Sequence, residues 1–442
     1  MNLREGAHIH LIAACGTAMG SLAAMLSEKG YRVTGSDAHI YPPMSTYLRE
    51  IGIELFEGFA PENLQTRPDL IVVGNAISRG NPELEAALDA AIPYTSLPEV
   101  LRDLFIRGKR SVVVTGTHGK TSTTALLAHI FHYNERNASY IFGGITSFHG
   151  IGGHYGDQDQ PIILETDEAF NTFKDINIDD LLVTNIDVDH LDYFKNFKNL
   201  LNAFKHVIEN VKGNLVLNFD DQNLRELKTS NNCISYSSSE IADIQIQYPN
   251  KIIIENEEYV VTTKLIGNHF ISNIAGAIAL AYLNGIKIED SIEAVETFPG
   301  VKRRTEYLGS IKGIKLYDDY GHHPTEIAAT ISALKENTIG KLYVIFQPHR
   351  YTRTKNGFED FRASLSKADE TIVVDIYPAG EEPIPGVSSK NFENKKIKYL
   401  KSMRMVPSYL STRVTENDII LTLGAGDITL LGPQILKYLD EI

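Results

Sequence analysis

Short apolar runs alternate with amphipathic stretches along the first hundred residues. The runs His8–Ala14, Tyr31–Ser36 and Leu70–Gly74 have the length and composition of buried strands. Between them, Ala18–Lys29 and Glu83–Ala91 carry apolar side chains at the spacing of a helix face. This strand–helix–strand rhythm predicts a parallel sheet with helices on both faces.

The same rhythm returns twice further along the chain, which predicts an α/β protein of three domains: 1–109, 110–299 and 300–442. The charged segment Arg102–Arg110 is the expected linker between the first two. The remaining predicted elements are Ser111–Val114, the helix Ser122–Tyr133, Pro161–Glu165, Leu181–Asn185, Asn214–Asn218, a small antiparallel addition over Ile244–Thr263, the Ala-rich helix Asn273–Leu283, and the strands Lys341–Phe346, Glu370–Asp375 and Asp418–Leu423.

Composition narrows the classes of function. The 442 residues are 43% hydrophobic and carry a net charge of −14, which argues against nucleic acid as the main partner, because phosphate-backbone binding needs a basic surface. The chain has no convincing signal peptide and no apolar run long enough to span a membrane, so the expected location is the cytoplasm, without a membrane partner. Two cysteines, Cys15 and Cys233, exclude a disulfide framework and a cysteine-rich zinc site.

The strongest local signal is GTHGKT, at Gly116–Thr121, between a predicted strand and a predicted helix. Glycines let a backbone wrap a phosphate, and the amides at the helix N-terminus then point at the anion. Lys120 would bridge the outer phosphates, and the Thr121 hydroxyl would bind Mg²⁺. Val114 stands where the full motif has its first glycine, so this is a shortened variant. The alternative is a glycine turn that only caps the helix.

A second, weaker glycine loop follows the first predicted strand, at Cys15–Gly20. It could hold a diphosphate, with Ser36 and Asp37 after the second strand reaching a ribose or a base. Its glycines could equally serve close packing of a helix on a strand. Ala13 and Ala14 stand where a dinucleotide-binding loop often has glycine.

Two further predicted strands end in candidate metal ligands, at Glu165–Glu168 and at Thr184–His190. Oxygen ligands with an occasional imidazole suit Mg²⁺ that phosphates also hold. Because the carboxyl ends of parallel strands meet at one sheet edge, these residues should face the Gly116–Thr121 loop. An Asp–His pair can also be purely structural.

The C-terminal region carries two polar segments, Asp318–Pro324 and Gln347–Thr354. The second packs three potential cations, His349, Arg350 and Arg353, into one short loop. Such a cluster suits an anionic intermediate or the carboxylate of an amino acid. The alternative is a solvated loop.

Together these residues resemble the Mur ligase family of bacterial cell-wall synthesis over essentially the whole chain. The resemblance rests on GTHGKT, Glu165, TNIDVDH at 184–190, the stretch 267–273, Lys302–Arg304 and DDYGHHPTE at 318–326. Phe346–Thr354 and Tyr377–Glu381 resemble the branch that adds L-alanine. The segments 35–59 and 74–88 look more like the branch that recycles murein tripeptide.

The resemblance implies an ATP-dependent ligase of peptidoglycan precursor synthesis. The lactyl carboxylate of UDP-N-acetylmuramate would take the γ-phosphoryl group of ATP, and the amine of L-alanine would attack the resulting acyl phosphate. The three domains would be a Rossmann-like UDP-sugar-binding domain, a P-loop ATP-binding domain and a Rossmann-like amino-acid-substrate domain. The implied cofactors are ATP and Mg²⁺ or Mn²⁺, and the chain would be a monomer or a homodimer. The alternatives are a tripeptide-recycling ligase, a dinucleotide-dependent oxidoreductase and a catalytically silent nucleotide-binding protein.

The resemblance also implies roles residue by residue. Catalytic roles fall to Lys120, His190, Arg304, His323, His349, Arg350 and Arg353. ATP would be bound by Gly116, Thr117, His118, Gly119, Lys120, Thr121, Ser122, Asn268, His269, Asn273, Arg304, Asp319 and Tyr320. The substrates would be bound by Gly16, Thr17, Ser36, Asp37, Asn75, Ala76, His349 and Arg350. The metal ligands would be Thr121, Glu165 and His190. Phe270 departs from the family, which usually has asparagine there.

Overall fold

The computed structural model describes residues 3–442 except 41, 43, 147–149, 167–176, 190 and 228–231, with backbone alone at 191 and 192. Its contacts divide the chain into two compact units. The first takes in the chain as far as Thr263 together with Ile271–Pro299, and the second takes in Lys264–Phe270 together with Gly300–Ile442. Among the described residues, the helices are all too short or too polar to cross a bilayer.

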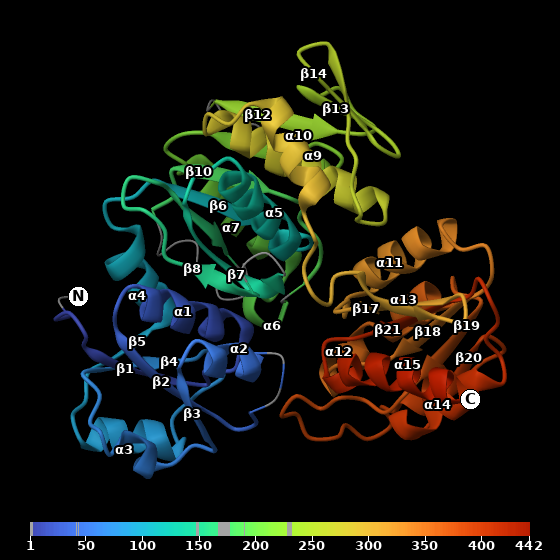
Figure 1. The fold of residues 1–442 in the computed structure, drawn as a ribbon, viewed down its shortest axis with the longest axis horizontal. Coiled ribbons are helices and arrows are strands. Elements are labelled where there is room, and N and C mark those ends of the chain that lie inside the picture. The colour runs from blue at the N-terminus through green and yellow to red at the C-terminus, as the bar shows by residue number, and fades with distance from the viewer. Residues whose placement is uncertain are drawn as a thin grey trace. The chain divides into compact units, whose positions relative to one another are not determined.

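The first unit opens with a fully parallel five-stranded sheet (Figure 1). Its elements are β1 (His8–Ile12), α1 (Thr17–Glu28), β2 (Arg32–Asp37), α2 (Met44–Glu50), β3 (Glu54–Glu57), β4 (Leu70–Val73), α3 (Pro82–Asp89), β5 (Tyr94–Ser96) and α4 (Leu97–Val100). The strand order β3-β2-β1-β4-β5 is that of a doubly wound nucleotide-binding fold. Central β1 is buried on both faces: Ile9 and Leu11 share a core cluster with Leu22 of α1, whereas Ile12 shares one with Leu84 of α3.

A ten-stranded sheet forms the rest of the first unit, in the order β15-β14-β13-β12-β11-β10-β6-β9-β7-β8. Its elements are β6 (Ser111–Thr115), α5 (Lys120–Tyr133), β7 (Ser139–Thr146), β8 (Gly150–His154), β9 (Ile162–Glu165), β10 (Asp180–Val183), α6 (Leu191–Phe194), α7 (Phe197–Glu209), β11 (Leu215–Asn218), α8 (Gln222–Glu226), β12 (Cys233–Ser237), β13 (Ile244–Gln247), β14 (Lys251–Ile254), β15 (Glu257–Val260), α9 (Asn268–Leu283) and α10 (Ile288–Thr297). The first residues of α9, as far as Phe270, group with the second unit. The strands from β13 to β15 pair antiparallel, as do β7 and β8, and the inner strands pair parallel. The carboxyl end of central β6 leads into the loop that precedes α5.

The second unit is a six-stranded sheet in the order β16-β17-β21-β18-β19-β20, with helices on both faces (Figure 1). Its elements are β16 (Glu306–Ile311), β17 (Ile314–Asp319), α11 (Pro324–Glu336), β18 (Leu342–Phe346), α12 (Tyr351–Asn356), α13 (Phe358–Leu365), β19 (Glu370–Val373), β20 (Ile397–Tyr399), α14 (Val406–Ser411), β21 (Ile419–Leu423) and α15 (Leu431–Glu441). Successive residues of β18 face opposite sides: Val344 clusters with Ile331 and Phe361, and Ile345 clusters with Ile435.

The predicted α/β architecture with three sheets is confirmed, including the antiparallel addition over 244–263. The hairpin β7–β8 was not predicted, because its glycines interrupt the apolar alternation. The three domain boundaries stay a prediction.

The segment Arg102–Arg110 packs part of its length into the core, and its role as a linker stays a prediction. Leu101–Ile106 forms a π-helical turn, and Phe105 and Ile106 belong to the same apolar cluster as β1 and α7. Arg110 Nε donates to the buried carboxylate of Asp180 at 2.6 Å.

Candidate active site

The loop between β6 and α5 has the backbone of an anion-binding site. Gly116 lies at φ +131° and Gly119 at φ +82°, where a side chain is strained. A Cβ on Gly116 would overlap Thr184 Oγ1 and approach Asn185 O to 2.9 Å. Gly119 caps α5, so the first amides of the helix, beginning at Lys120, point out of its N-terminus. The glycines and the helix N-terminus therefore lie where a phosphate-binding loop needs them, and the binding of phosphate stays a prediction.

The end of β10 holds this loop in shape. The Thr117 amide donates to Asn185 O at 3.0 Å, and the His118 amide donates to Asn185 Oδ1 at 2.8 Å. In return, Thr184 Oγ1 and Asn185 Nδ2 donate to His118 O at 2.6 and 2.9 Å. Sequence reasoning grouped these residues with candidate metal ligands, whereas the structure uses them to hold the loop.

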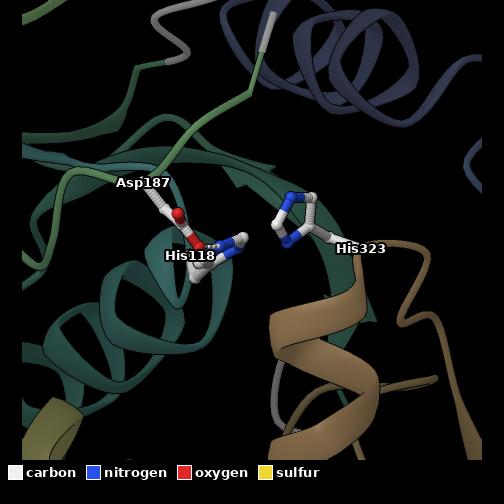
Figure 2. Close-up of side chains that lie close together, drawn as sticks. All are labelled: His118, Asp187 and His323. Carbon is white, nitrogen blue, oxygen red and sulfur yellow. Dashed lines mark hydrogen bonds and ion pairs between the residues drawn. The ribbon is translucent and has the colours of Figure 1, made fainter. Parts of the chain in front are cut away.

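His118 extends the same contact through its side chain. Its Nε2 donates to Asp187 Oδ2 at 3.0 Å. Figure 2 shows the two side chains close together. The Asp187 amide in turn donates to Thr117 Oγ1 at 2.9 Å. His323, also labelled in Figure 2, belongs to the second unit, where its Nδ1 accepts from the Thr325 amide at the start of α11.

Thr121 and Glu165 join the loop to the neighbouring strand. Thr121 Oγ1 donates to Glu165 Oε1 at 2.7 Å, and the Gly143 amide of β7 donates to Glu165 Oε2 at 2.6 Å. A hydroxyl beside a carboxylate is the hard-oxygen donor set that Mg²⁺ prefers, so these residues fit the expected ion. Lys120 Nζ donates to the carbonyls of Gly116 and Thr117 within the loop. His190, the third predicted ligand, lies outside the described residues.

The predicted adenine-binding residues fall in two places. Asn273 lies beside the loop, since a Cβ on Gly119 would be 2.8 Å from its Oδ1. Asn268 and His269 group with the second unit, where Asn268 is exposed. Burial lowers the pKa of His269 to about 4, and its ring packs against buried Phe270 with centroids 4.3 Å apart.

The predicted UDP-binding residues lie at the carboxyl ends of β1, β2 and β4. The loop that follows β1, Cys15–Gly20, is the N-terminal loop. The Asp37 carboxylate accepts from the Cys15 amide at 2.9 Å, so Asp37 holds the loop as well as bordering it. Ser36 is fully buried. The exposed members of the predicted set are Gly16, Thr17, Asn75 and Ala76.

The N-terminal loop and the phosphate loop, Gly116–Thr121, approach each other on the two sides of β7. Ser21 Oγ of α1 donates to Phe142 O at 2.9 Å and so docks the helix on the strand. A Cβ built on the next residue, Gly143, would lie 3.4 Å from Thr17 Oγ1 and 3.6 Å from Glu165 Oε2. Gly143 was not predicted from the sequence; the only signal was a glycine pair inside a strand, which often marks close approach of a ligand or of backbone.

In the second unit, Arg303 and Arg304 flank the end of β17. Arg303 donates to Gly424 O at 2.6 Å. Both guanidinium groups lie over the Tyr320 ring, that of Arg303 at 4.9 Å and that of Arg304 at 5.1 Å from its centroid. The Asp319 carboxylate is buried and already accepts from Thr305 and Gly321.

Burial raises the pKa of Asp319 to about 6, against the opposing effects of Arg304 and of the two backbone hydrogen bonds. The predicted contact of Asp319 with the ribose remains a prediction, and so do the roles of Arg304 and Tyr320.

The predicted cation loop carries two cations at neutral pH rather than three. Burial, followed by the nearby charges of His322, Arg353 and Arg350, lowers the pKa of His349 to about 3, so that its imidazole is neutral. The His349 ring stacks on Tyr377 with centroids 5.6 Å apart.

Arg350 is held in an unusual conformation by its neighbours. Its backbone lies at φ +70°, a strained region for a side chain of this size. Its Nε donates to Glu381 Oε1 at 2.6 Å, and the same carboxylate accepts from Thr352. Burial alone would raise the pKa of Glu381, but the hydrogen bonds from Thr352 and Arg350 lower it below its usual value.

Three family models match successive parts of the chain. They are the Mur ligase family, catalytic domain, over residues 8–109; the Mur ligase middle domain, over 114–281; and the Mur ligase, glutamate ligase domain, over 303–426. The matches begin and end close to the three sheets of the structure.

Full-length relatives agree with these matches. The UDP-N-acetylmuramate–L-alanine ligase of Brucella anthropi is 34% identical, over 98% of this chain and 97% of the relative. The crystal structure of the UDP-N-acetylmuramate–alanine ligase of Thermotoga maritima has a TM-score of 0.84 at 26% identity, covering 98% of both chains. A murein peptide ligase of Psychrobacter arcticus has a TM-score of 0.73 at 27% identity, covering 99% of both chains. The chain therefore belongs to the Mur ligase family.

Proposed function

We propose that the protein joins L-alanine to UDP-N-acetylmuramate at the expense of ATP, in peptidoglycan precursor synthesis. The observation that carries the proposal is the Thr121–Glu165 hydrogen bond of 2.7 Å beside a glycine loop that opens a helix. That arrangement suits a nucleoside triphosphate and a divalent cation. The full-length relative from Brucella anthropi bears the name of this activity.

The phosphate loop is the proposed ATP site. The amides that follow Gly119 and the ammonium of Lys120 would hold the phosphates, and Asn273 borders the loop at Gly119. Thr121 and Glu165, with His190, would hold Mg²⁺ or Mn²⁺, which would supply positive charge to offset that of the phosphates.

The first chemical step is an in-line transfer. The lactyl carboxylate of the nucleotide-sugar forms a bond to the γ-phosphorus, and the bond to the leaving oxygen of ADP breaks. The product is an acyl phosphate. Lys120 and Arg304 lower the barrier by positioning and by neutralising charge on the phosphoryl oxygens.

The second step forms the amide bond. The neutral amine of L-alanine attacks the acyl carbon and gives a tetrahedral oxyanion, which then expels inorganic phosphate. Arg350 and Arg353 provide positive charge for the amino acid carboxylate or for phosphate. Neutral His349 suits a hydrogen-bonding role, because it carries no charge near pH 7. His323 is the proposed candidate for accepting the amine proton.

The N-terminal loop is the proposed site of the UDP part of the substrate. Exposed Gly16, Thr17, Asn75 and Ala76 lie at the carboxyl ends of β1 and β4, the usual position of nucleotides on such sheets. Since the reaction consumes ATP and a nucleotide-sugar, we place it in the cytoplasm.

Phosphate release tests the amino substrate. Purified protein is mixed with ATP, Mg²⁺ and UDP-N-acetylmuramate, and then with L-alanine, glycine, L-serine or the tripeptide L-Ala-γ-D-Glu-meso-diaminopimelate. Turnover that depends strictly on both the nucleotide-sugar and L-alanine supports the proposal. Turnover with the tripeptide but not with L-alanine would replace the proposed activity by the recycling activity. The similarity to a murein peptide ligase, at 27% identity, makes that alternative worth testing. Absence of turnover with every amine would overturn both.

A further inference from the structure

Glu381 lies on a loop after β19 and reaches the loop that carries Arg350. Its carboxylate accepts three hydrogen bonds at once. Oε1 accepts from Arg350 Nε and from Thr352 Oγ1, each at 2.6 Å, and Oε2 accepts from the Thr352 amide at 2.9 Å. The Glu381 side chain is 16% exposed, whereas that of Arg350 is 42% exposed. The carboxylate is therefore the more enclosed and more firmly held member of the pair.

A tight turn brings Glu381 to this position. Ala379 and Gly380 have φ of +49° and +85°, the signs of a type I′ turn. Across the turn, the Glu381 amide donates to Pro378 O at 3.0 Å. A left-handed conformation is unfavourable for alanine, so the surrounding contacts must hold Ala379 there. The turn fixes the direction in which the Glu381 side chain leaves the backbone.

The segment before the turn pairs with the Arg350 loop. The Arg350 amide donates to Tyr377 O at 2.9 Å, and the Tyr377 amide donates to Pro348 O at 2.8 Å. Arg350 itself lies at φ +70°, where a residue of this size is strained. Two backbone hydrogen bonds and the Glu381 carboxylate therefore surround a residue whose conformation would be unfavourable in an isolated loop.

Glu381 uses only one edge of the Arg350 guanidinium. Among the residues that the structure describes, the side-chain hydrogen bonds of Arg350 come from Nε alone. A guanidinium can present two parallel donors to a carboxylate, either along its Nε edge or at its end. Because Glu381 takes Nε, the two Nη atoms form the remaining pair. A carboxylate from outside would be bound end-on, and Glu381 sets the direction in which that end points.

We propose that Glu381 is a positioning residue for the amine substrate. By holding Nε, it aims the two Nη atoms of Arg350 at the carboxylate of L-alanine, and this places the amine for its attack on the acyl phosphate. The inference rests on the proposed function. It adds a residue that acts on the substrate through Arg350 rather than by its own contact.

A purely structural role would have different consequences. Glu381 also accepts the amide of Thr352 in the first turn of α12, so the alternative is that it only caps this helix. Loss of a cap lowers the stability of the protein, but it gives no reason for the KM of one substrate to change while the others stay constant. Kinetics can therefore separate the two roles.

Glu381→Gln removes the charge and replaces one acceptor oxygen by a donor, which breaks the set of three hydrogen bonds. In the phosphate-release assay, the KM for L-alanine should rise about tenfold or more, while the KM values for ATP and UDP-N-acetylmuramate stay unchanged. Glu382→Gln is the matched control, because Glu382 carries the same charge at the next position and is exposed. An unchanged KM for L-alanine in Glu381→Gln, or an equal rise in Glu382→Gln, would overturn the proposal.

A double-mutant cycle shows whether Glu381 acts through Arg350. Arg350→Lys keeps the positive charge but replaces the planar pair of donors by one ammonium group. In that background, Glu381→Gln should change the KM for L-alanine by less than about twofold, because no guanidinium is left to aim. Effects of the two substitutions that simply multiply would show that Glu381 acts elsewhere.

Thr352→Val supplies a second variant should Glu381→Gln fail to fold. It removes the hydroxyl that donates to Oε1 and keeps the amide that donates to Oε2, so the KM for L-alanine should rise about twofold to fivefold. An unchanged KM would contradict the proposal.

The unchanged protein separates this proposal from the proposed function. If it ligates L-alanine with a KM that Glu381→Gln does not alter, only the positioning role is rejected. If it ligates the tripeptide alone, the proposed function is rejected. A tripeptide KM that Glu381→Gln raises and Glu382→Gln does not would then retain the positioning role for a carboxylate of that substrate, and equal KM values would reject it too.

Discussion

The loop after β1 (the first loop) and the loop after β6 (the second loop) make the same strand-to-helix turn with different residues. In the loop after β6, the left-handed positions are glycines, Gly116 and Gly119. In the loop after β1, the left-handed position at φ +70° is Ala13, and Gly16 has an ordinary φ of −65°. A left-handed conformation costs a non-glycine residue roughly 1–2 kcal/mol, so the first loop tolerates strain that the second avoids.

The first loop obtains its space from the strands that face it. A Cβ on Gly35 of β2 would overlap the methyl group of Ala14, and a Cβ on Gly74 would lie 3.0 Å from that of Ala13. The second loop instead needs glycines within itself. A Cβ on Gly116 would overlap Thr184, and a Cβ on Gly119 would lie 2.8 Å from Asn273 Oδ1. A loop can therefore lack the glycine signature when the glycines that make room for it lie on neighbouring segments.

Gly116→Ala should have the largest effect. The substitution combines left-handed strain with overlap of Thr184 and Asn185, which should lower the free energy of unfolding by about 2–5 kcal/mol. Urea unfolding followed by circular dichroism measures it. A variant as stable as the unchanged protein would contradict the description of this loop.

Lys120→Ala should abolish most turnover while the fold persists. Removing one charge from the phosphoryl-transfer site should cost about 100- to 1,000-fold in kcat, the scale seen when a transition-state donor is lost. Phosphate release measures the rate, and circular dichroism checks the fold. Unchanged turnover would move the ATP site away from this loop.

Gly35→Ala and Gly16→Ala separate the strand from the first loop itself. Overpacking against Ala14 should make Gly35→Ala less stable by about 1–3 kcal/mol. Gly16→Ala should change stability by at most about 0.5 kcal/mol, because its Cβ would meet only Ala13 O, at 3.7 Å. The reverse order of these two effects would show that the first loop depends on its own glycine rather than on the glycine of the facing strand.

The reactivity of the Cys15 thiol measures how far the first loop is shielded from solvent. It requires no substitution and is expected to show the smallest effect. Burial, with a contribution from the Asp37 carboxylate, raises the pKa of Cys15 to about 12. A raised pKa lowers the thiolate fraction at pH 8, so iodoacetamide should alkylate Cys15 about tenfold or more slowly than a cysteine in a short peptide. The rate should keep rising with pH beyond pH 10. Peptide mass spectrometry measures it, and a plateau near pH 9 would show an open, solvated loop.

Much of the fold and part of the candidate site could be predicted from the sequence. The glycines of the second loop, the strand before it and the helix after it are all local features, and each lies where the pattern predicted. The hydrogen bond from Gly143 to Glu165 could not be predicted, because it depends on β7 lying between α1 and β9. The glycines of β7 also interrupt the apolar pattern by which a strand is recognised in the sequence. The neutrality of His349 was equally hidden, since composition counts a histidine as a potential cation regardless of its burial.

The amino-acid sequence alone determined the alternation of strands and helices, the glycine backbone at 116–119 and the Thr121 hydroxyl beside it, because periodicity and backbone freedom are properties of neighbouring residues. Only the tertiary structure decided that Asn185 shapes the phosphate loop, that Glu165 is held from two sides, and that Thr17 lies across Gly143 from it. These contacts join segments far apart in the chain, and their distances follow from how sheets and helices stack. Burial, hydrogen bonding and the pKa values that depend on them arise only once those segments come together.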